Sequence, residues 1–497
     1  MTGTVLALPV AVPLLAAGAL LAVGGRRTVH RLTAMAVHAG VLLLGVALVN
    51  ATTDGTVFVQ NIGSWPPGIA IVLAADTLSA LMLSVSALLA LLATAFAAAT
   101  ADDGSPLFTP LALVLSAGVY GAFLTTDLFN LFVFVEVMLV PSYALLTQAG
   151  GTRRGSAARI YVTTSLLAST LLLAGVALVY GVTGTVSLAE LAGAAQHSRA
   201  AALACSVVLL ALATKAAVVP LHGWLPRTYP AAPPAVVVLF SGLLTKVAVY
   251  ATMRVYALVF NGTGLRWVFM AAALLTMAAG VLGAVGEQAM KSILCFHMVS
   301  QIGYILLGIA LFTPAGLAAA IFFQVQYVLV KAALLTCAGA VETTHRTDRL
   351  DRLGNLARQD PLLAAAFMAA ALSLAGLPPL SGFVAKLGLI RAAASTTDYL
   401  ALATAIAVSF FTLVSMIKIW EGAFWGEPTA RAASTARPVP PPPRERTSER
   451  MALALPAVVL AAPSLLLGIQ AQPLLTASAA AADGLINTSA YVRAVGR

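Results

Sequence analysis

Long apolar segments, separated by short polar ones, follow one another along almost the whole chain. A helix needs about 20 mostly apolar residues to cross the ~30 Å hydrocarbon core of a bilayer. By that measure, the pattern predicts about fourteen membrane-spanning helices. We expect them near residues 4–23, 30–51, 72–100, 107–124, 128–149, 157–183, 200–220, 232–258, 265–285, 291–312, 315–341, 361–394, 398–424 and 451–471.

One short loop, at residues 56–72, has a different pattern. Two apolar stretches, Thr56-Val-Phe-Val and Ile69-Ala-Ile-Val, flank Gly63-Ser-Trp-Pro-Pro. Apolar stretches rich in β-branched residues on either side of a glycine- and proline-containing turn are typical of a β-hairpin. We expect any β structure in the chain to be confined to this loop.

A five-residue pattern occurs twice, as Pro220-Leu-His-Gly-Trp224 and as Pro379-Leu-Ser-Gly-Phe383, 159 residues apart. That offset corresponds to five predicted helices, and an odd number places the second copy in the opposite orientation. The pattern therefore predicts two inverted repeats, helices four to eight and nine to thirteen. Because proline removes a backbone hydrogen bond and glycine loosens the helix, helices seven and twelve should be broken.

These observations divide the chain into five regions. They are helices one to three (1–106), the first repeat (107–258), the second repeat (259–425), a cytoplasmic linker rich in proline and arginine (426–450), and helix fourteen with a tail (451–497). The linker composition is typical of irregular structure.

The composition, 60% hydrophobic and only 9% charged, excludes a soluble globular protein. The fold class is therefore an all-α polytopic membrane protein. No secretory signal peptide is expected, since the first apolar segment lacks a basic region before it, and Arg26 and Arg27 follow it.

The net charge of +10 is distributed by side of the membrane. With both termini outside, seventeen basic residues lie on the inner side: Arg26, Arg27, Arg31, Arg153, Arg154, Arg159, Arg227, Lys291, Arg346, Arg349, Arg352, Arg358, Arg431, Arg437, Arg444, Arg446 and Arg450. Five lie outside: Arg199, Arg266, Arg391, Arg493 and Arg497. This bias predicts cytoplasmic inner loops and argues against a nucleic-acid partner.

The three cysteines, Cys205, Cys295 and Cys337, lie in apolar segments without metal-ligand spacing, so we expect neither disulfides nor a metal site. The chain shows no dinucleotide fingerprint and no cysteine set for an iron–sulfur cluster. It is therefore not expected to bind a cofactor or to hold a redox centre of its own.

Five charged residues lie deep inside apolar segments: Glu136, Lys215, Lys246, Lys331 and Lys386. An isolated charge near the bilayer centre costs ~2.5–3.5 kcal/mol on insertion scales. Such residues must therefore pair with one another or line water. Their presence indicates ion or proton transfer.

Glu136 is expected near the middle of the membrane. Helix five begins at Asp127, a good N-cap, and Glu136 follows nine residues later, about 13.5 Å along the axis. A carboxylate at that depth needs a cation, and Lys215 is the candidate. If a proton arrives, the pair can open, and if it leaves, the pair can close. The alternative is a static ion pair that fixes packing.

The other deep groups extend this interpretation. Buried lysine can give up its proton, so Lys246, Lys331 and Lys386 could carry protons onward. His297 and His222 could bridge, since imidazole both donates and accepts a proton, although either could instead be a packing residue.

Three further charged residues are expected to be structural. We expect Asp76 to cap helix three, and Arg254 and Lys418, near helix ends, to reach the membrane surface by snorkelling.

At this point the chain resembles a family, the proton-translocating membrane subunits shared by respiratory complex I, membrane hydrogenases and Mrp-type cation/proton antiporters. The resemblance rests on Asp127-Leu-Phe-Asn-Leu-Phe-Val-Phe-Val-Glu136, Lys215-Ala-Ala-Val-Val-Pro-Leu-His-Gly-Trp-Leu-Pro226, Leu243-Leu-Thr-Lys-Val-Ala-Val-Tyr250, Ser300-Gln-Ile-Gly-Tyr304 and Gly376-Leu-Pro-Pro-Leu-Ser-Gly-Phe-Val-Ala-Lys386. It implies fourteen helices with two inverted repeats, Glu136 and Lys215 as a coupled pair, Lys246 as a central relay and Lys386 as a terminal carrier.

Within that family the chain looks most like the D-type subunits of the Mrp Na⁺/H⁺ antiporters, chiefly through residues 127–143 and Tyr229-Pro-Ala-Ala-Pro-Pro-Ala. Two features depart from the family pattern. Arg227 stands where complex I relatives usually carry an acid. Helix eleven has Gln324, Gln326 and Tyr327 where relatives often place a histidine, so the role of Lys331 there depends on water or on His297.

The resemblance implies a proton-carrying subunit of a multisubunit antiporter in a bacterial plasma membrane. Its partners would be a large A-type subunit and small hydrophobic subunits, with sodium crossing elsewhere in the complex. The alternatives are a proton-pumping arm of an NADH or ferredoxin:quinone oxidoreductase or of a membrane hydrogenase, and a membrane scaffold without transport.

Overall fold

The computed structural model describes residues 5–24, 26–65, 71–148, 150, 152–426 and 447–496. Most of the predicted linker at 426–450 lies outside these residues. The first helices are α1 (Leu8–Val23), α2 (Arg27–Thr52), α3 (Thr77–Thr100), α4 (Phe108–Leu124), α5 (Leu128–Thr147), α6 (Thr152–Thr183), α7 (Ala194–His197) and α8 (Arg199–Lys215). They are followed by α9 (Trp224–Thr228), α10 (Pro234–Phe260), α11 (Arg266–Gly286), α12 (Met290–Leu311), α13 (Pro314–His345), α14 (Leu356–Gln359), α15 (Pro361–Ala375), α16 (Ser381–Ser395), α17 (Tyr399–Ile419), α19 (Thr447–Ile469), α20 (Gln472–Ile486) and α21 (Ser489–Val495).

The predicted all-α polytopic fold is confirmed. Within the described part of the chain, ten helices are long and apolar enough to cross a membrane, and three shorter apolar ones are α1, α4 and α15. The prediction of about fourteen crossings requires these three, with α15 continued by α16, and α8 continued by α9, to cross as well. That count stays a prediction.

An antiparallel hairpin forms as predicted, but it extends past the 56–72 loop to which β structure was expected to be confined. Strand β1 (Phe58–Asn61) pairs antiparallel with β2 (Val72–Ala75), with Phe58 opposite Ala75 and Asn61 opposite Val72. The second strand begins later than the sequence pattern suggested. Residues 66–70, which include part of the predicted turn, lie outside the described residues.

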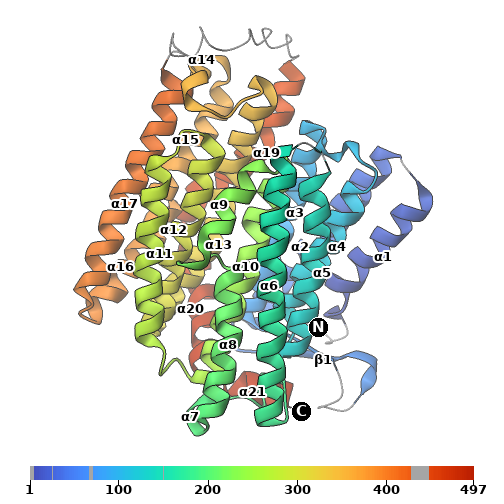
Figure 1. Cartoon of the computed structure of the whole chain (residues 1–497), viewed down its shortest axis with the longest axis vertical. Coiled ribbons are helices and arrows are strands. Elements are labelled where there is room, and N and C mark those ends of the chain that lie inside the picture. The colour runs from blue at the N-terminus through green and yellow to red at the C-terminus, as the bar shows by residue number, and fades with distance from the viewer. Residues whose placement is uncertain are drawn as a thin grey trace.

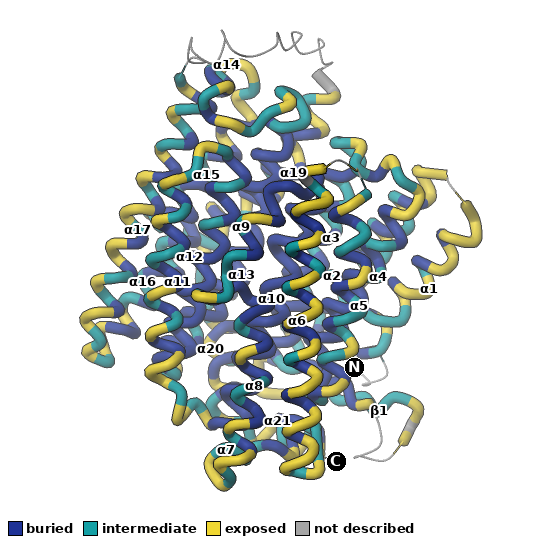
Figure 2. The backbone as a smooth tube through the Cα atoms, in the orientation of Figure 1, coloured by how far each residue is buried: buried dark blue, intermediate teal, exposed yellow. Residues whose placement is uncertain are grey.

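Three helices, α10, α12 and α13, form the centre of the molecule and are buried on nearly all sides. Figure 2 shows this core in dark blue, with exposed positions on the surrounding helices. Those outer helices present large apolar side chains, among them Leu43, Trp267 and Phe410, each more than half exposed. An apolar outer surface around an apolar core is what a lipid-facing bundle requires.

The two ends of the bundle differ. In Figure 1, α14 lies at the top, whereas both chain ends, β1, α7 and α21 lie in the lower half. We refer to these as the α14 end and the hairpin end. Helix caps are as predicted at two positions: Asp76 accepts from the backbone N–H of Ser79 (3.0 Å) and Asp127 from that of Asn130 (2.7 Å).

The predicted break in helix seven separates α8 from α9. Helix α8 ends at Lys215, and the chain then passes through residues 216–223 before α9 begins. Backbone groups that the break leaves without a helical partner bind side chains instead. Trp224 Nε1 donates to the Thr214 carbonyl (2.9 Å), and Val219 N–H donates to Thr276 Oγ1 (3.1 Å). The break is thus fixed by hydrogen bonds, as a non-helical backbone within a membrane must be.

The predicted break in helix twelve separates α15 from α16. Gly376 ends α15 with φ +90°, a left-handed conformation that favours glycine. Gly382 lies so close to α15 that a Cβ atom there would be 1.7 Å from the Ser373 carbonyl oxygen. The Gly-Leu-Pro-Pro-Leu-Ser-Gly segment, residues 376–382, therefore encodes both the break and the close return of the chain.

Candidate functional site

Glu136 and Lys215 are joined through a third residue that the sequence did not indicate. Lys215 Nζ donates to Ser169 Oγ (2.8 Å), and Ser169 Oγ donates to Glu136 Oε1. Helices α5, α6 and α8 each supply one residue. The predicted pair is thus bridged by a hydroxyl group, which can donate and accept at the same time.

A small cavity adjoins Lys215, lined in part by Ser165, Thr214, Trp224 and Leu244. Its volume, about 20 Å³, is enough for roughly one water molecule. Since Leu244 belongs to α10, the cavity lies between the Lys215 site and the helix that bears Lys246. Lys215 and Lys246 themselves share no hydrogen bond in the described part of the chain.

Lys246 is fully buried in the middle of α10. Its Nζ donates to the Ser241 carbonyl (2.7 Å) and lies 3.3 Å from Thr245 Oγ1. The same nitrogen sits 4.4 Å from the centroid of the Tyr327 ring. A carbonyl and an aromatic face stabilise the ammonium form.

Lys331 and His297 bring α12 and α13 together around the same core. Lys331 Nζ donates to the Leu294 carbonyl, and His297 Nε2 lies 2.6 Å from Ser415 Oγ on α17. His297 makes no hydrogen bond to a lysine in the part of the chain that is described, but the charges of Lys331 and Lys386 both act on it. Lys246 and Lys331 also interact electrostatically.

Lys386 lies just after the second break. Its Nζ donates to the Ala375 carbonyl at the end of α15 (3.1 Å) and sits 4.9 Å from the centroid of the Tyr304 ring. Tyr304 stacks on Phe323 (5.4 Å between centroids), which in turn lies 6.0 Å from Tyr327. A row of three aromatic rings therefore connects the lysine at the second break with Lys246.

His222 does not join this row. It is half-buried in the first break, and its Nδ1 has no hydrogen-bond partner within the described residues. Several buried polar atoms of α12 and α13 share that property in the part of the chain that the structure describes: His297 Nδ1, both polar atoms of the Gln301 side chain, Gln324 Oε1 and Tyr327 OH.

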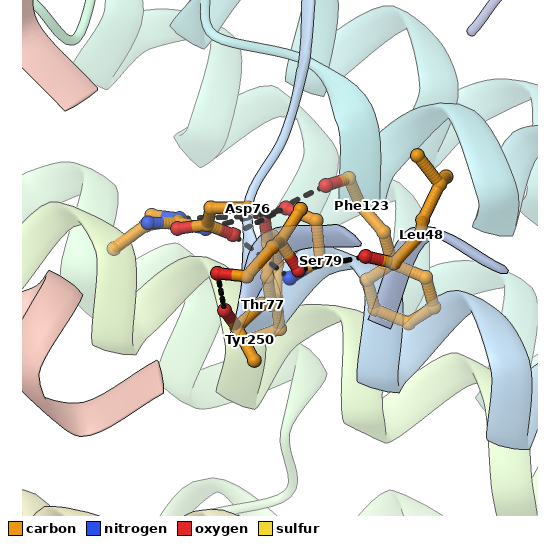
Figure 3. A network of polar contacts seen from close by, with 8 residues as sticks. Leu48, Asp76, Thr77, Ser79, Phe123 and Tyr250 are labelled. Carbon is orange, nitrogen blue, oxygen red and sulfur yellow. Dashed lines mark hydrogen bonds and ion pairs between the residues drawn. The ribbon is translucent and has the colours of Figure 1, made fainter. Parts of the chain in front are cut away.

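The prediction that Arg254 snorkels is wrong. Arg254 is only 3% exposed and forms an ion pair with Asp76, and its Nε donates to Tyr250 OH (3.3 Å). Figure 3 shows Asp76, Ser79 and Tyr250 gathered in this network, where the Ser79 and Tyr250 hydroxyls lie 2.9 Å apart. The pair leaves neither buried charge without a partner, and an unpaired buried charge would be costly.

Lys291, predicted to lie on the inner side of the membrane, is buried in the structure. It lies in the first turn of α12, is only 2% exposed, and places Nζ 2.6 Å from Glu342 Oε2. Lys418, by contrast, remains at a helix end, where it donates to the Val285 (2.9 Å) and Glu287 (2.5 Å) carbonyls. Hydropathy alone could not distinguish these two lysines, because the partner of Lys291 lies 51 residues away in the chain.

No group of three or more histidine, cysteine or acidic side chains suited to a metal ion occurs among the described residues. The polar side chains of the bundle described above are lysine amines, hydroxyls, amides, an imidazole, the Glu136 carboxylate and the Asp76–Arg254 pair. The amines, the imidazole and the Glu136 carboxylate can take up and release protons, and the hydroxyls and amides donate and accept hydrogen bonds.

Comparison with known proteins identifies the family. Residues 125–412 match the sequence profile of the NADH:quinone oxidoreductase/Mrp antiporter transmembrane family. The D subunit of the Na⁺/H⁺ antiporter of Alkalihalophilus pseudofirmus is 36% identical, and that of Bacillus subtilis 32%, each over 98% of both chains.

Solved structures support the same family assignment. A chain of the Mrp complex from a Dietzia species is 47% identical, with a TM-score of 0.95 over the full length of both chains. A chain of respiratory complex I from Thermus thermophilus is 25% identical, with a TM-score of 0.81 over 97% of this chain and 99% of that one. The chain therefore belongs to the NADH:quinone oxidoreductase/Mrp antiporter family of membrane subunits, and within it to the antiporter D subunits.

Proposed function

We propose that this chain carries protons within a multisubunit Na⁺/H⁺ antiporter. The observation that supports this most directly is the series of charged groups from the half-buried Glu136 to the buried Lys386, held on broken and unbroken helices of the bundle. The D-type relatives, which match over nearly their whole length, point to the same activity.

Protons fit this interior better than sodium. Lysine can release a proton and take it back, whereas an ammonium group repels Na⁺. Sodium would therefore cross elsewhere in the complex. The large A-type subunit and small hydrophobic subunits are the partners that this assignment requires.

The proposed relay has three sections. Glu136, Ser169 and Lys215 form the first, Lys246 and Lys331 the second, and Lys386 the end, with His297 between Lys331 and Lys386. Buried polar atoms are nearly always hydrogen-bonded. The unpaired amide, imidazole and phenol atoms beside the lysines are therefore where the relay would accept water or a proton in transit.

A redox pump remains the second candidate, because the Thermus complex I chain shares the fold over almost the whole chain. The higher identity to the Dietzia Mrp chain and to the antiporter D subunits favours the antiporter. Co-purification of flavin and iron–sulfur subunits with the tagged chain, in place of antiporter subunits, would favour the redox pump.

We infer that the chain lies in a bacterial plasma membrane, with the α14 end in the cytoplasm and both termini outside. The support is the distribution of basic residues. Arg346, Arg349, Arg352 and Arg358 all follow α13 at the α14 end, and basic residues near short loops favour the cytoplasmic side.

The test uses the complete complex in inside-out vesicles from a host without other Na⁺/H⁺ antiporters. Glu136→Ala and Lys215→Ala should each abolish the pH change that Na⁺ induces, while the complex still assembles. Assembly is followed by pull-down of the tagged chain. Normal transport by either assembled variant would exclude the coupled-pair mechanism.

A further inference from the structure

A second pair of lysine and glutamate lies at the α14 end, outside the relay described above. Lys291 Nζ is 2.6 Å from Glu342 Oε2 and donates to the Ala232 carbonyl (3.2 Å). Lys291 is 2% exposed, whereas the Glu342 side chain is 29% exposed. The lysine is thus buried, whereas the Glu342 side chain is partly exposed, with its Oε2 enclosed beside the lysine.

Two more carboxylates surround this lysine. Asp348 Oδ2 accepts from the backbone N–H of Lys291 (3.2 Å). Asp102, in the short helix η3 (Asp102–Gly104), accepts from the Ala235 N–H (2.8 Å) and interacts electrostatically with both Lys291 and Glu342. Three carboxylates therefore lie around Lys291, and one of them, Glu342, is against its ammonium group.

The pair is continuous with the relay through the contact between α12 and α13. Lys331 and Glu342 are eleven residues apart on α13, so they lie on the same face of the helix, about 16.5 Å apart along its axis. Both contact α12 on that face: Glu342 binds Lys291, and Lys331 Nζ donates to the carbonyl of Leu294, three residues further on. The Lys291–Glu342 pair and Lys331 thus lie along one helix contact, the pair at the α14 end and Lys331 deeper in the bundle.

We propose that Glu342 and Lys291 form the port through which protons pass between the cytoplasm and Lys331. This proposal rests on the proposed function and on its orientation. It adds a site to the relay, because neither residue belongs to the series from Glu136 to Lys386.

A proton passes from water to Lys331 in three steps. The Glu342 carboxylate takes a proton from water at the α14 end, which removes the negative charge that holds the proton on Lys291. The Lys291 ammonium then passes its proton inward to the neutral Lys331 amine, either directly or through water. Finally, Glu342 returns its proton to the Lys291 amine and becomes a carboxylate again. One proton has moved from water to Lys331.

The competing explanation is structural: Lys291 fixes the start of α10 through the Ala232 carbonyl, and Glu342 only neutralises it. Lys291→Arg separates the two explanations. A guanidinium keeps the charge, the ion pair and a donor for the carbonyl, but it cannot be deprotonated in proteins. A structural role survives that change, and a proton-carrying role does not.

The experiment measures the initial rate of the Na⁺-induced pH change in vesicles that contain the complete complex. We expect Lys291→Arg to lower the rate about 100-fold, the usual contribution of a positioned proton-transfer group, with assembly unchanged. Glu342→Gln should lower it similarly, and Glu342→Asp should restore part of it. The matched control is Lys418→Arg, because Lys418 binds only the Val285 and Glu287 carbonyls among the contacts described; it should transport normally.

Wild-type rates in the assembled Lys291→Arg variant would overturn the port. If that variant does not assemble, Glu342→Gln decides, since it leaves the lysine in place, and a wild-type rate there would overturn the port equally. A wild-type complex that shows no Na⁺-driven pH change would instead contradict the proposed function.

Discussion

At the scale of single residues, partners decide what a buried charge does. Glu136 and Lys215 are linked by the Ser169 hydroxyl, Lys246 by a carbonyl and an aromatic face, and Arg254 by a carboxylate. Lys215 and Lys246 each donate to a neutral oxygen, and a water molecule could replace that partner. The Arg254 pair is held by a group that does not lose its proton, and we assign it to stability.

Ser169 provides a direct test of the bridge. Ser169→Ala removes the hydroxyl between Glu136 and Lys215 without removing a charge, and we expect the rate of Na⁺-driven proton movement to fall about tenfold or more. Ser206→Ala is the matched control, because Ser206 Oγ only donates to the Ala202 carbonyl of its own helix (2.8 Å). Equal rates in the two variants would show that the bridge is dispensable.

Arg254 is predicted to contribute to stability. Arg254→Met leaves Asp76 as a mostly buried carboxylate without its partner and should cost about 3–5 kcal/mol in the free energy of unfolding. Asp76→Asn together with Arg254→Met should recover much of that loss. Thermal unfolding of the purified complex measures both. Arg349→Met, in an exposed ion pair, should change little, and an equal loss there would argue against the role of burial.

At the scale of elements, the helix pairs α4–α5 and α11–α12 pack in the same way. Added Cβ atoms at Gly118 and Gly121 would meet Met138 and Phe134 of α5 at 2.5 and 2.3 Å. At Gly280 and Gly283 they would meet Ser300 and Phe296 of α12, each at 2.3 Å. These four residues lie 162 residues after their counterparts, and this supports our proposal that 107–258 and 259–425 are repeats.

Gly280 tests that packing. Gly280→Val should force α11 from α12, because its Cβ would lie 2.3 Å from the backbone nitrogen of Ser300, and we expect the complex to lose most of its assembled form. Gly181→Val is the control, since nothing lies within 4 Å of a Cβ there. Size-exclusion profiles of the tagged complex report both, and intact complex in the Gly280 variant would contradict the close packing.

At the scale of the whole molecule, the orientation assigns the Glu342 port to one side of the membrane. In the Arg346→Cys variant, we expect a membrane-impermeant maleimide to label the new thiol only in inside-out vesicles. In the Thr488→Cys variant, we expect labelling only in intact cells. The native Cys205, Cys295 and Cys337 are buried and should give little background. The reverse pattern would invert the topology and, with it, the side from which the port is loaded.

Much of the molecule could be predicted from the sequence, because hydropathy, charge depth and helix breaks are local properties. The apolar segments gave the class of fold, the Pro-Leu-x-Gly-aromatic motifs gave both breaks, and the depth of the charges singled out Glu136 and four lysines. Hairpin pairing and the Asp76 and Asp127 caps also follow from residues close in sequence.

Only the tertiary structure decided which groups meet. Ser169 lies between Glu136 and Lys215 because α6 passes between the helices that bear them, and hydropathy gives no sign of that. Tyr304 and Tyr327 turn their faces to lysines from other helices, Arg254 finds Asp76 across 178 residues, and Lys291 finds Glu342 across the contact of α12 and α13. Sequence sets how deep a charge lies along its own helix, but its partner comes from a neighbouring helix, and that neighbour is fixed only when the bundle packs.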